Sequence, residues 1–161
     1  MGKYLEKILY SFGDEMFQWL KMFADLLPGR IGWRCRSYVV GKKLIHGEGL
    51  YVGRFVDVRG LVVVGDNVRI FDFCRLHAND DGKIVVGNNV DFTVNVAVTA
   101  SNGGEVTIGN NCLFAPNLML RASDHGFADP NIPIKNQPHQ SGTIVIGDDV
   151  WIGANSVVTR N

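Results

Sequence analysis

Residues 86–90, Val86-Gly87-Asn88-Asn89-Val90, form one of four copies of a single motif. The other copies are Val64-Gly65-Asp66-Asn67-Val68, Ile108-Gly109-Asn110-Asn111-Cys112 and Ile146-Gly147-Asp148-Asp149-Val150. Successive copies begin 22, 22 and 38 residues apart. Repetition of this kind is typical of solenoid proteins, in which each repeat buries its apolar face against its neighbours.

Within each repeat, a large apolar residue recurs at every sixth position. These residues are Val64, Ile70 and Leu76; Val86, Phe92 and Val98; Ile108, Phe114 and Leu120; and Ile146, Ile152 and Val158. A period of six matches neither the 3.6-residue period of a helix nor the alternation of an ordinary strand. Three such positions per repeat predict a coil with three flat sides, whose equivalent residues stack in interior ladders. We therefore predict a parallel β-helix with Gly, Asn and Asp at its corners, because these residues tolerate positive φ.

The composition agrees with one compact domain. The chain has 161 residues, 46% of them hydrophobic, and 19 glycines, which indicates many tight turns. Lysine and arginine together number 16, as do the acidic residues, so the chain as a whole is not a nucleic-acid-binding polycation. Cys35, Cys74 and Cys112 form no C-x-x-C pair, which favours a reducing, cytoplasmic location, and we expect Cys74 and Cys112 to lie in the interior.

Four further motifs carry a family resemblance. They are Ala115-Pro116-Asn117, Asp124-His125-Gly126-Phe127, Pro133-Ile134 and the run from Trp151 to Asn155. With the hexads, they resemble the hexapeptide-repeat acyltransferases, and in particular the sugar O-acetyltransferase branch of galactoside, maltose, O-antigen and capsule acetyltransferases. The resemblance implies an all-β fold, a left-handed parallel β-helix with an N-terminal helical segment and one long extruded loop. It also implies acetyl-coenzyme A as co-substrate, a saccharide acceptor and a homotrimer with sites between subunits.

The last spacing exceeds the others by 16 residues, which are inserted after Leu120. A long loop in a compact repeat usually serves a function. His125 matches the family's catalytic histidine, and imidazole suits the removal of a hydroxyl proton near neutral pH. The alternative is a solvent-exposed loop histidine. Asp124 either orients the His125 imidazole or serves as a turn residue.

The resemblance also implies residues for the acceptor and the coenzyme. Asn95 matches the acceptor-binding asparagine, although Asn117 and Asn155 share its hexad position and a purely structural asparagine stack is the alternative. Trp151, Ala154 and Asn117 are the predicted coenzyme-binding residues, with outer-face packing as the alternative for Trp151. The sequence contains no metal-spaced Cys/His set, and we predict no metal.

Residues 1–43 form a different segment, separate from the β-helix domain predicted over 44–161. Apolar residues recur at three- and four-residue intervals, which predicts either one amphipathic helix or two that are interrupted at Gly13, with an end at Pro28-Gly29. The apolar residues are Leu5, Ile8, Leu9, Phe12, Met16, Trp19, Leu20, Phe23 and Leu27. A basic stretch without acids follows, with Arg30, Arg34, Arg36, Lys42 and Lys43. We favour a cap over the open end of the β-helix; the alternative is peripheral contact with the inner face of an anionic membrane.

Together these features predict an enzyme that moves an acetyl group from acetyl-coenzyme A to a hydroxyl of a sugar or polysaccharide precursor. The alternative is a non-catalytic β-helix that binds a saccharide or a protein partner. The family continues through a further coil and a closing arm after the motif that begins at Trp151. We therefore expect the β-helix to be shortened at its C-terminus and to bind coenzyme A weakly.

Overall fold

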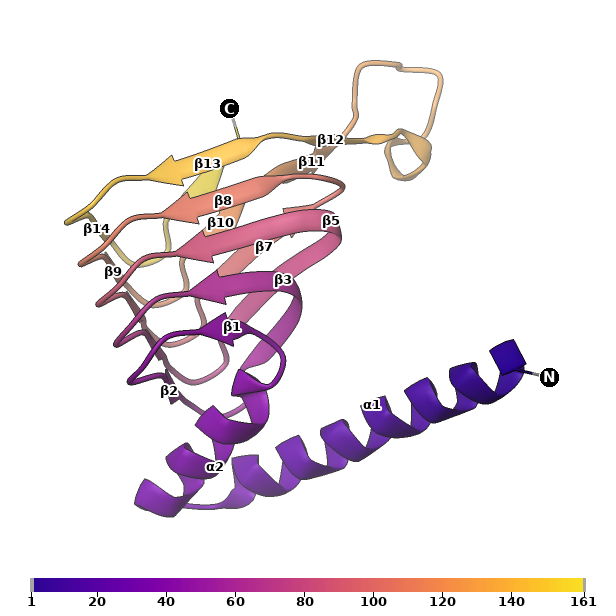
Figure 1. The fold of residues 1–161 in the computed structure, drawn as a ribbon. Helices are drawn as coiled ribbons and strands as arrows, with labels where there is room; N and C mark the ends of the chain where they lie inside the picture. The colour runs from indigo at the N-terminus through magenta and orange to yellow at the C-terminus, as the bar shows by residue number, and fades with distance from the viewer. Residues whose placement is uncertain (1, 161) are drawn as a thin grey trace.

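The computed structural model describes residues 2–160, with side chains from Gly13 onward. Two helices, α1 (Gly2–Leu26) and α2 (Gly29–Gly41), lead into a stack of coils built from short parallel strands (Figure 1). Side 1 of each coil belongs to a five-stranded sheet. Its strands are β2 (Tyr51–Val52), β4 (Arg69–Ile70), β6 (Asp91–Phe92), β9 (Leu113–Phe114) and β14 (Trp151–Ile152).

Sides 2 and 3 share one sheet, because two long strands pass round the corner between them. These are β3 (Asp57–Val64) and β5 (Arg75–Val86). Side 2 continues in β7 (Ala97–Ser101), β10 (Met119–Arg121) and β15 (Val157–Thr159). Side 3 includes β1 (Ile45–His46), β8 (Glu105–Ile108) and β13 (Thr143–Ile146).

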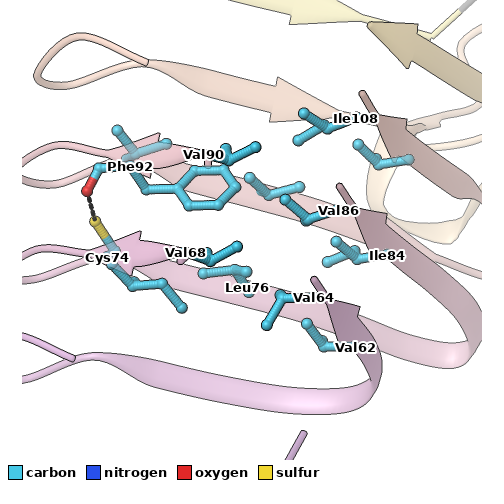
Figure 2. Close-up of a cluster of buried hydrophobic side chains, with 14 of the residues drawn as sticks. Val62, Val64, Val68, Cys74, Leu76, Ile84, Val86, Val90, Phe92 and Ile108 are labelled. Atoms are coloured by element: carbon cyan, nitrogen blue, oxygen red, sulfur yellow. Dashed lines mark hydrogen bonds between the residues drawn. The ribbon is translucent and has the colours of Figure 1, made fainter. Parts of the chain in front are cut away.

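The predicted interior ladders are present in the predicted register. Val64 pairs with Val86, Val86 with Ile108 and Ile108 with Ile146 on side 3. The other two ladders are Ile70, Phe92, Phe114 and Ile152 on side 1, and Leu76, Val98, Leu120 and Val158 on side 2. Figure 2 shows part of this interior, with Val64, Val86 and Ile108 of the side 3 ladder on successive coils. The fold is a left-handed parallel β-helix with N-terminal helices, which confirms the predicted fold class.

The repeated Gly-Asn-Asn motif forms the corner between sides 3 and 1. Asn67, Asn89 and Asn111 have φ of 55°, 55° and 57°, in the left-handed region that asparagine tolerates. The preceding glycine leaves room for the next coil, since a Cβ on Gly65 would lie 2.2 Å from Asn88 Oδ1. That oxygen accepts a hydrogen bond from the Asp66 backbone N at 2.7 Å. The motif therefore repeats because each corner is hydrogen-bonded to the next.

The additional residues of the longer repeats lie at the corner between sides 2 and 3. The last of these insertions begins with β11 (Ser123–His125) and returns through β12 (His139–Ser141), with a short 3-10 turn, η1 (Ile134–Asn136), between them. The loop extends beyond the edge of the β-helix (Figure 1). It emerges directly after β10, as the spacing predicted.

α1 is a single helix that continues through Gly13, one of the two arrangements that the sequence left open. The basic stretch itself forms α2, which was not predicted as a helix. Within it, Arg36 is buried and donates hydrogen bonds to the carbonyl oxygens of Ala24, Leu27 and Val52 at 3.0–3.2 Å. The three carbonyls explain the burial, because they offset the desolvation of the guanidinium.

α2 lies against the first coil. The Trp33 and Tyr51 rings are 5.7 Å apart, and Ser37 Oγ accepts a hydrogen bond from the Val52 backbone N at 3.0 Å. Val40 joins the hydrophobic core. α1 contacts α2 but otherwise leads away from the β-helix (Figure 1). The predicted apolar residues Leu5, Ile8, Leu9 and Phe12 lie outside the described side chains. Within residues 2–160, no helix is long and apolar enough to cross a membrane.

Candidate active site

His125 lies at the base of the extruded loop. β11 pairs with β12 in antiparallel fashion, which places His125 opposite His139. The two imidazole rings are 4.0 Å apart and inclined at 44°. Gly126 N donates to Pro138 O at 2.9 Å and closes the ribbon one residue further on. An exposed imidazole is thus held on a paired strand, against a second imidazole that the sequence did not single out.

Asp124 contacts two arginines. Its carboxylate oxygens lie 3.7 Å from Arg121 Nε and 3.3 Å from Arg160 Nε. Because successive side chains of a strand point to opposite faces, Asp124 is directed away from the face that carries His125. The carboxylate therefore ties the ribbon to β10 and to the residue that follows β15.

The loop beyond His125 is organised around a buried glutamine. Gln137 Nε2 donates hydrogen bonds to the carbonyl oxygens of Asp129 and Ile132, both at 2.9 Å, and its Oε1 accepts one from Asp129 N at 3.3 Å. Side chains of this size and polarity are rarely buried without such partners. The Gln137 side chain therefore holds together the part of the loop that has no strand pairing. Nothing in its sequence position indicates this role.

Asn95 stands in a ladder of asparagines at the corner between sides 1 and 2. Asn95 Nδ2 donates to Asn117 Oδ1 at 2.9 Å, and Asn117 Nδ2 donates to Asn155 Oδ1 at 3.2 Å. All three have φ near 60° and are exposed. The structural stack that the sequence left open is present, and it engages both ends of the Asn117 amide.

Two phenylalanines continue this corner in the earlier coils. Phe55 and Phe73 have φ of 56° and 64°, a conformation that is unfavourable for a bulky residue. Their rings stack 5.3 Å apart at an interplanar angle of 17°, with about half of each side chain exposed. The hexad pattern does not indicate this pair, because it records only the interior positions.

Asn95 and His125 lie at opposite ends of side 2 within one chain. Asn95 precedes β7, whereas β11 lies beside the far end of the same strand. β7 has five residues, which corresponds to about 16 Å of strand. One chain therefore does not bring these two predicted site residues together.

Trp151 and Ala154 lie on the last coil. Trp151 pairs with Leu113 on the outer face of side 1 and is 71% exposed. Ala154 is exposed at the following corner, next to Asn155 of the asparagine ladder. Ala154 and Asn117 thus lie at the corner between sides 1 and 2, with Trp151 on the adjoining side 1, whereas the loop leaves from the other end of side 2.

A titratable cluster outside this site occupies side 2. Asp57 Oδ2 lies 2.9 Å from both His77 Nε2 and Arg59 Nε. Burial raises the pKa of the Asp57 carboxyl, but the Arg59 guanidinium and the hydrogen bond with His77 outweigh it and hold the pKa below its usual value. His77 itself lies in β5 and pairs with Thr99 of β7.

A groove on side 1 does not coincide with the predicted residues. It has a volume of about 540 Å³ and is lined by Trp33, Tyr51, the Arg69–Asp91 ion pair and Leu113. None of the predicted site residues lines it, and His125 is exposed at the base of its loop. Among residues 2–160, no group of three or more His, Cys, Asp or Glu side chains is placed to hold a metal.

No family model matches the chain, and no curated protein matches it by sequence. Solved structures do match. One is a variant of AntD, an N-acyltransferase from Bacillus cereus, in complex with dTDP and coenzyme A, with a TM-score of 0.64 and 19% identity over 78% of this chain and 70% of AntD. The chain therefore shares the β-helix fold of AntD.

Two further AntD variants give the same result. One, in complex with dTDP-4-amino-4,6-dideoxyglucose and coenzyme A, has a TM-score of 0.58 at 24% identity. Another, in complex with dTDP and coenzyme A, has a TM-score of 0.58 at 22% identity. In these two comparisons the match covers 72% of this chain and 63% of AntD, so the chain spans less than two thirds of that protein's length. At this level of identity the likeness concerns the fold.

Proposed function

We propose that the protein is a coenzyme A-dependent acyltransferase that acetylates a hydroxyl of a sugar or polysaccharide precursor. The observation that carries the proposal is the placement of His125. It is an exposed imidazole fixed on a short ribbon beside a solvent-facing edge, in a fold shared with an acyltransferase that binds coenzyme A.

In this mechanism the His125 imidazole removes the proton from the acceptor hydroxyl as its oxygen attacks the thioester carbonyl. The carbon–sulfur bond then breaks, and the proton passes to the departing thiolate. His139 positions the His125 ring through their 4.0 Å contact. Asp124 is a positioning residue as well, because its ion pairs with Arg121 and Arg160 fix the ribbon against the coil.

The acceptor and donor residues require a second copy of the chain. Since Asn95 and His125 lie at opposite ends of side 2, a site that uses both is completed by a neighbouring subunit of a homotrimer. The Asn95 amide nitrogen is engaged by Asn117, so Asn95 offers its oxygen to an acceptor hydroxyl. Trp151 and the Ala154 backbone hold the pantetheine arm of acetyl-coenzyme A, and the engaged Asn117 amide supports that edge.

The test is transfer of labelled acetyl groups from acetyl-coenzyme A to a panel of neutral sugars and amino sugars. His125→Ala should reduce turnover by about 10²- to 10⁴-fold with little effect on thermal stability, as expected for loss of a positioned base. His46→Ala, which removes another exposed histidine, is the matched control and should retain full turnover. Full turnover in His125→Ala would contradict the assignment of the base.

A second candidate, acyl transfer to an amine, is favoured by the likeness to AntD, which is crystallised with an amino sugar nucleotide. The same panel distinguishes the two, because O-linked and N-linked acetyl products differ in their stability to mild base. Saccharide binding without any transfer, measured by isothermal titration with coenzyme A and with sugars, would instead indicate a non-catalytic binding protein.

A further inference from the structure

In the described part of α1, two acidic side chains bond to the rest of the protein while most of the large apolar side chains face solvent. Asp25 is buried and accepts hydrogen bonds from Lys21 Nζ and from the Phe55 backbone N, both at 3.0 Å. Asp14 forms an ion pair with Lys43 at 3.0 Å. This is the reverse of an ordinary surface helix in a globular protein, which faces the core with its apolar side.

The exposed apolar side chains form one continuous stripe. Between 38% and 67% of each is exposed, and their three- and four-residue spacing places them along one side of the helix. The stripe consists of Met16, Trp19, Leu20, Phe23, Leu26 and Leu27. The Trp19 and Phe23 rings lie 6.4 Å apart at its centre. A patch of this kind marks an interaction site, because its exposure to water is unfavourable.

The charge of the chain is divided between its two parts. Residues 1–43 contain eight Lys and Arg against four Asp and Glu, a net charge of +4. Residues 44–161 contain eight against twelve, a net charge of −4, although the whole chain is neutral. Arg30 and Arg34 are exposed at the start of α2, directly after the stripe, and Ile31 between them is 70% exposed.

We propose that the stripe of α1 inserts into the interfacial region of a lipid bilayer that contains anionic lipids, with Arg30 and Arg34 at the headgroups. Tryptophan and phenylalanine on the apolar side of a helix fit interfacial binding, and the cations that attract an anionic surface follow α1 directly, in the basic stretch that begins at Arg30. The acidic β-helix is repelled by the same surface, which keeps its side faces clear of the lipid. A second copy of the chain is a poorer occupant, because it would bring two segments of +4 together.

The experiment is flotation of the full chain with vesicles of phosphatidylcholine alone and of phosphatidylcholine with 30% phosphatidylglycerol. The protein should bind the anionic vesicles, and raising the salt from 0.1 M to 0.5 M should weaken binding. Trp19→Gln/Phe23→Gln should reduce the partition coefficient at least tenfold. Arg30→Ala/Arg34→Ala should reduce it about 25-fold, since each cation contributes about fivefold near the surface.

The matched control is Val145→Gln/Val157→Gln, which removes two exposed apolar side chains from the β-helix and should leave binding unchanged. Circular dichroism melts check that every variant is folded. Failure of the wild-type chain to float with anionic vesicles would overturn the proposal. So would binding that Trp19→Gln/Phe23→Gln does not weaken, since it would be purely electrostatic. A smaller oligomer for this variant, measured by sedimentation without vesicles, would assign the stripe to a contact between copies instead.

Discussion

At the residue scale, the corners depend on side chains that accept positive φ. Three asparagines and two phenylalanines occupy equivalent positions between sides 1 and 2, yet only the asparagines suit that conformation and bond to one another. The phenylalanines are held there by their stacking and by the contact of the Phe55 backbone N with Asp25. The same positive-φ corner is therefore stabilised by side-chain hydrogen bonds in the later coils and by aromatic stacking in the earlier ones.

The asparagine ladder allows the structural and binding roles of Asn95 to be separated. Asn95→Ala puts alanine, which tolerates positive φ less well than asparagine, at φ 59° and removes the bond to Asn117, so it should lower the free energy of unfolding by about 1 to 2 kcal/mol. Asn95→Gly also removes the amide but relieves the backbone, and should cost clearly less. Chemical denaturation measures both. If the proposed acceptor contact is present, the glycine variant should raise KM for the sugar despite its near-normal stability.

Cys74 is a buried thiol whose chemistry follows from its surroundings. Burial raises its pKa to about 11, and Sγ lies 2.8 Å from the carbonyl oxygen of Thr93. At pH 8 only about one Cys74 in a thousand is a thiolate. Iodoacetamide should therefore modify Cys35, which is partly exposed, and leave Cys74 intact until the protein unfolds. Peptide mass mapping of the native protein would contradict this if Cys74 were alkylated as fast as Cys35.

At the scale of elements, the β-helix is stabilised by the interior ladders between coils and not by the individual strands. Several strands contain only two residues, too few to be stable by themselves. Phe92 and Phe114 are fully buried and stack 5.1 Å apart at an interplanar angle of 12° across β6 and β9. The coil register is thus fixed by contacts between repeats.

Truncation of this stack should be costly. Phe114→Ala should lower the free energy of unfolding by about 3 to 5 kcal/mol, through lost burial and the cavity left behind. Leu113→Ala, one residue earlier in β9 and pointing outward, is the matched control and should cost far less. Equal melting temperatures for the two variants would show that the assigned register is wrong.

Arg36 is the link between the two helices and the first coil. Replacing it with leucine leaves the carbonyl oxygens of Ala24, Leu27 and Val52 without this donor, which should cost about 1 to 3 kcal/mol. Arg34→Leu, at an exposed position of the same helix, should change stability by less than about 0.5 kcal/mol. Thermal melts compare them, and an unaffected Arg36→Leu would mean that α1 is held by other contacts.

At the scale of the whole molecule, the proposed site requires that several copies of the chain associate. A chain of 17.8 kDa that presents Asn95 and His125 at opposite ends of side 2 should form a trimer in solution, with a mass near three times this value. Sedimentation equilibrium measures it. A monomer that still transfers acetyl groups would show that one of the two residues lies outside the site.

The sequence by itself determined the β-helix. The regular spacing of the repeats predicts its interior positions, its corner residues and the origin of the long loop. This works because each residue of a coil contacts the equivalent residue of the next coil, so its surroundings can be read from the repeat itself. His125 could be singled out for the same reason, since a motif and an insertion mark it. Outside the repeats, only the tertiary structure showed which residues are in contact. The pairing of His125 with His139, the arginine partners of Asp124, the burial of Arg36 and the outward apolar stripe of α1 join residues with no repeating relation in sequence. Contacts of that kind depend on how a loop closes and on which face a helix presents to the rest of the protein. A local sequence pattern contains no information about either.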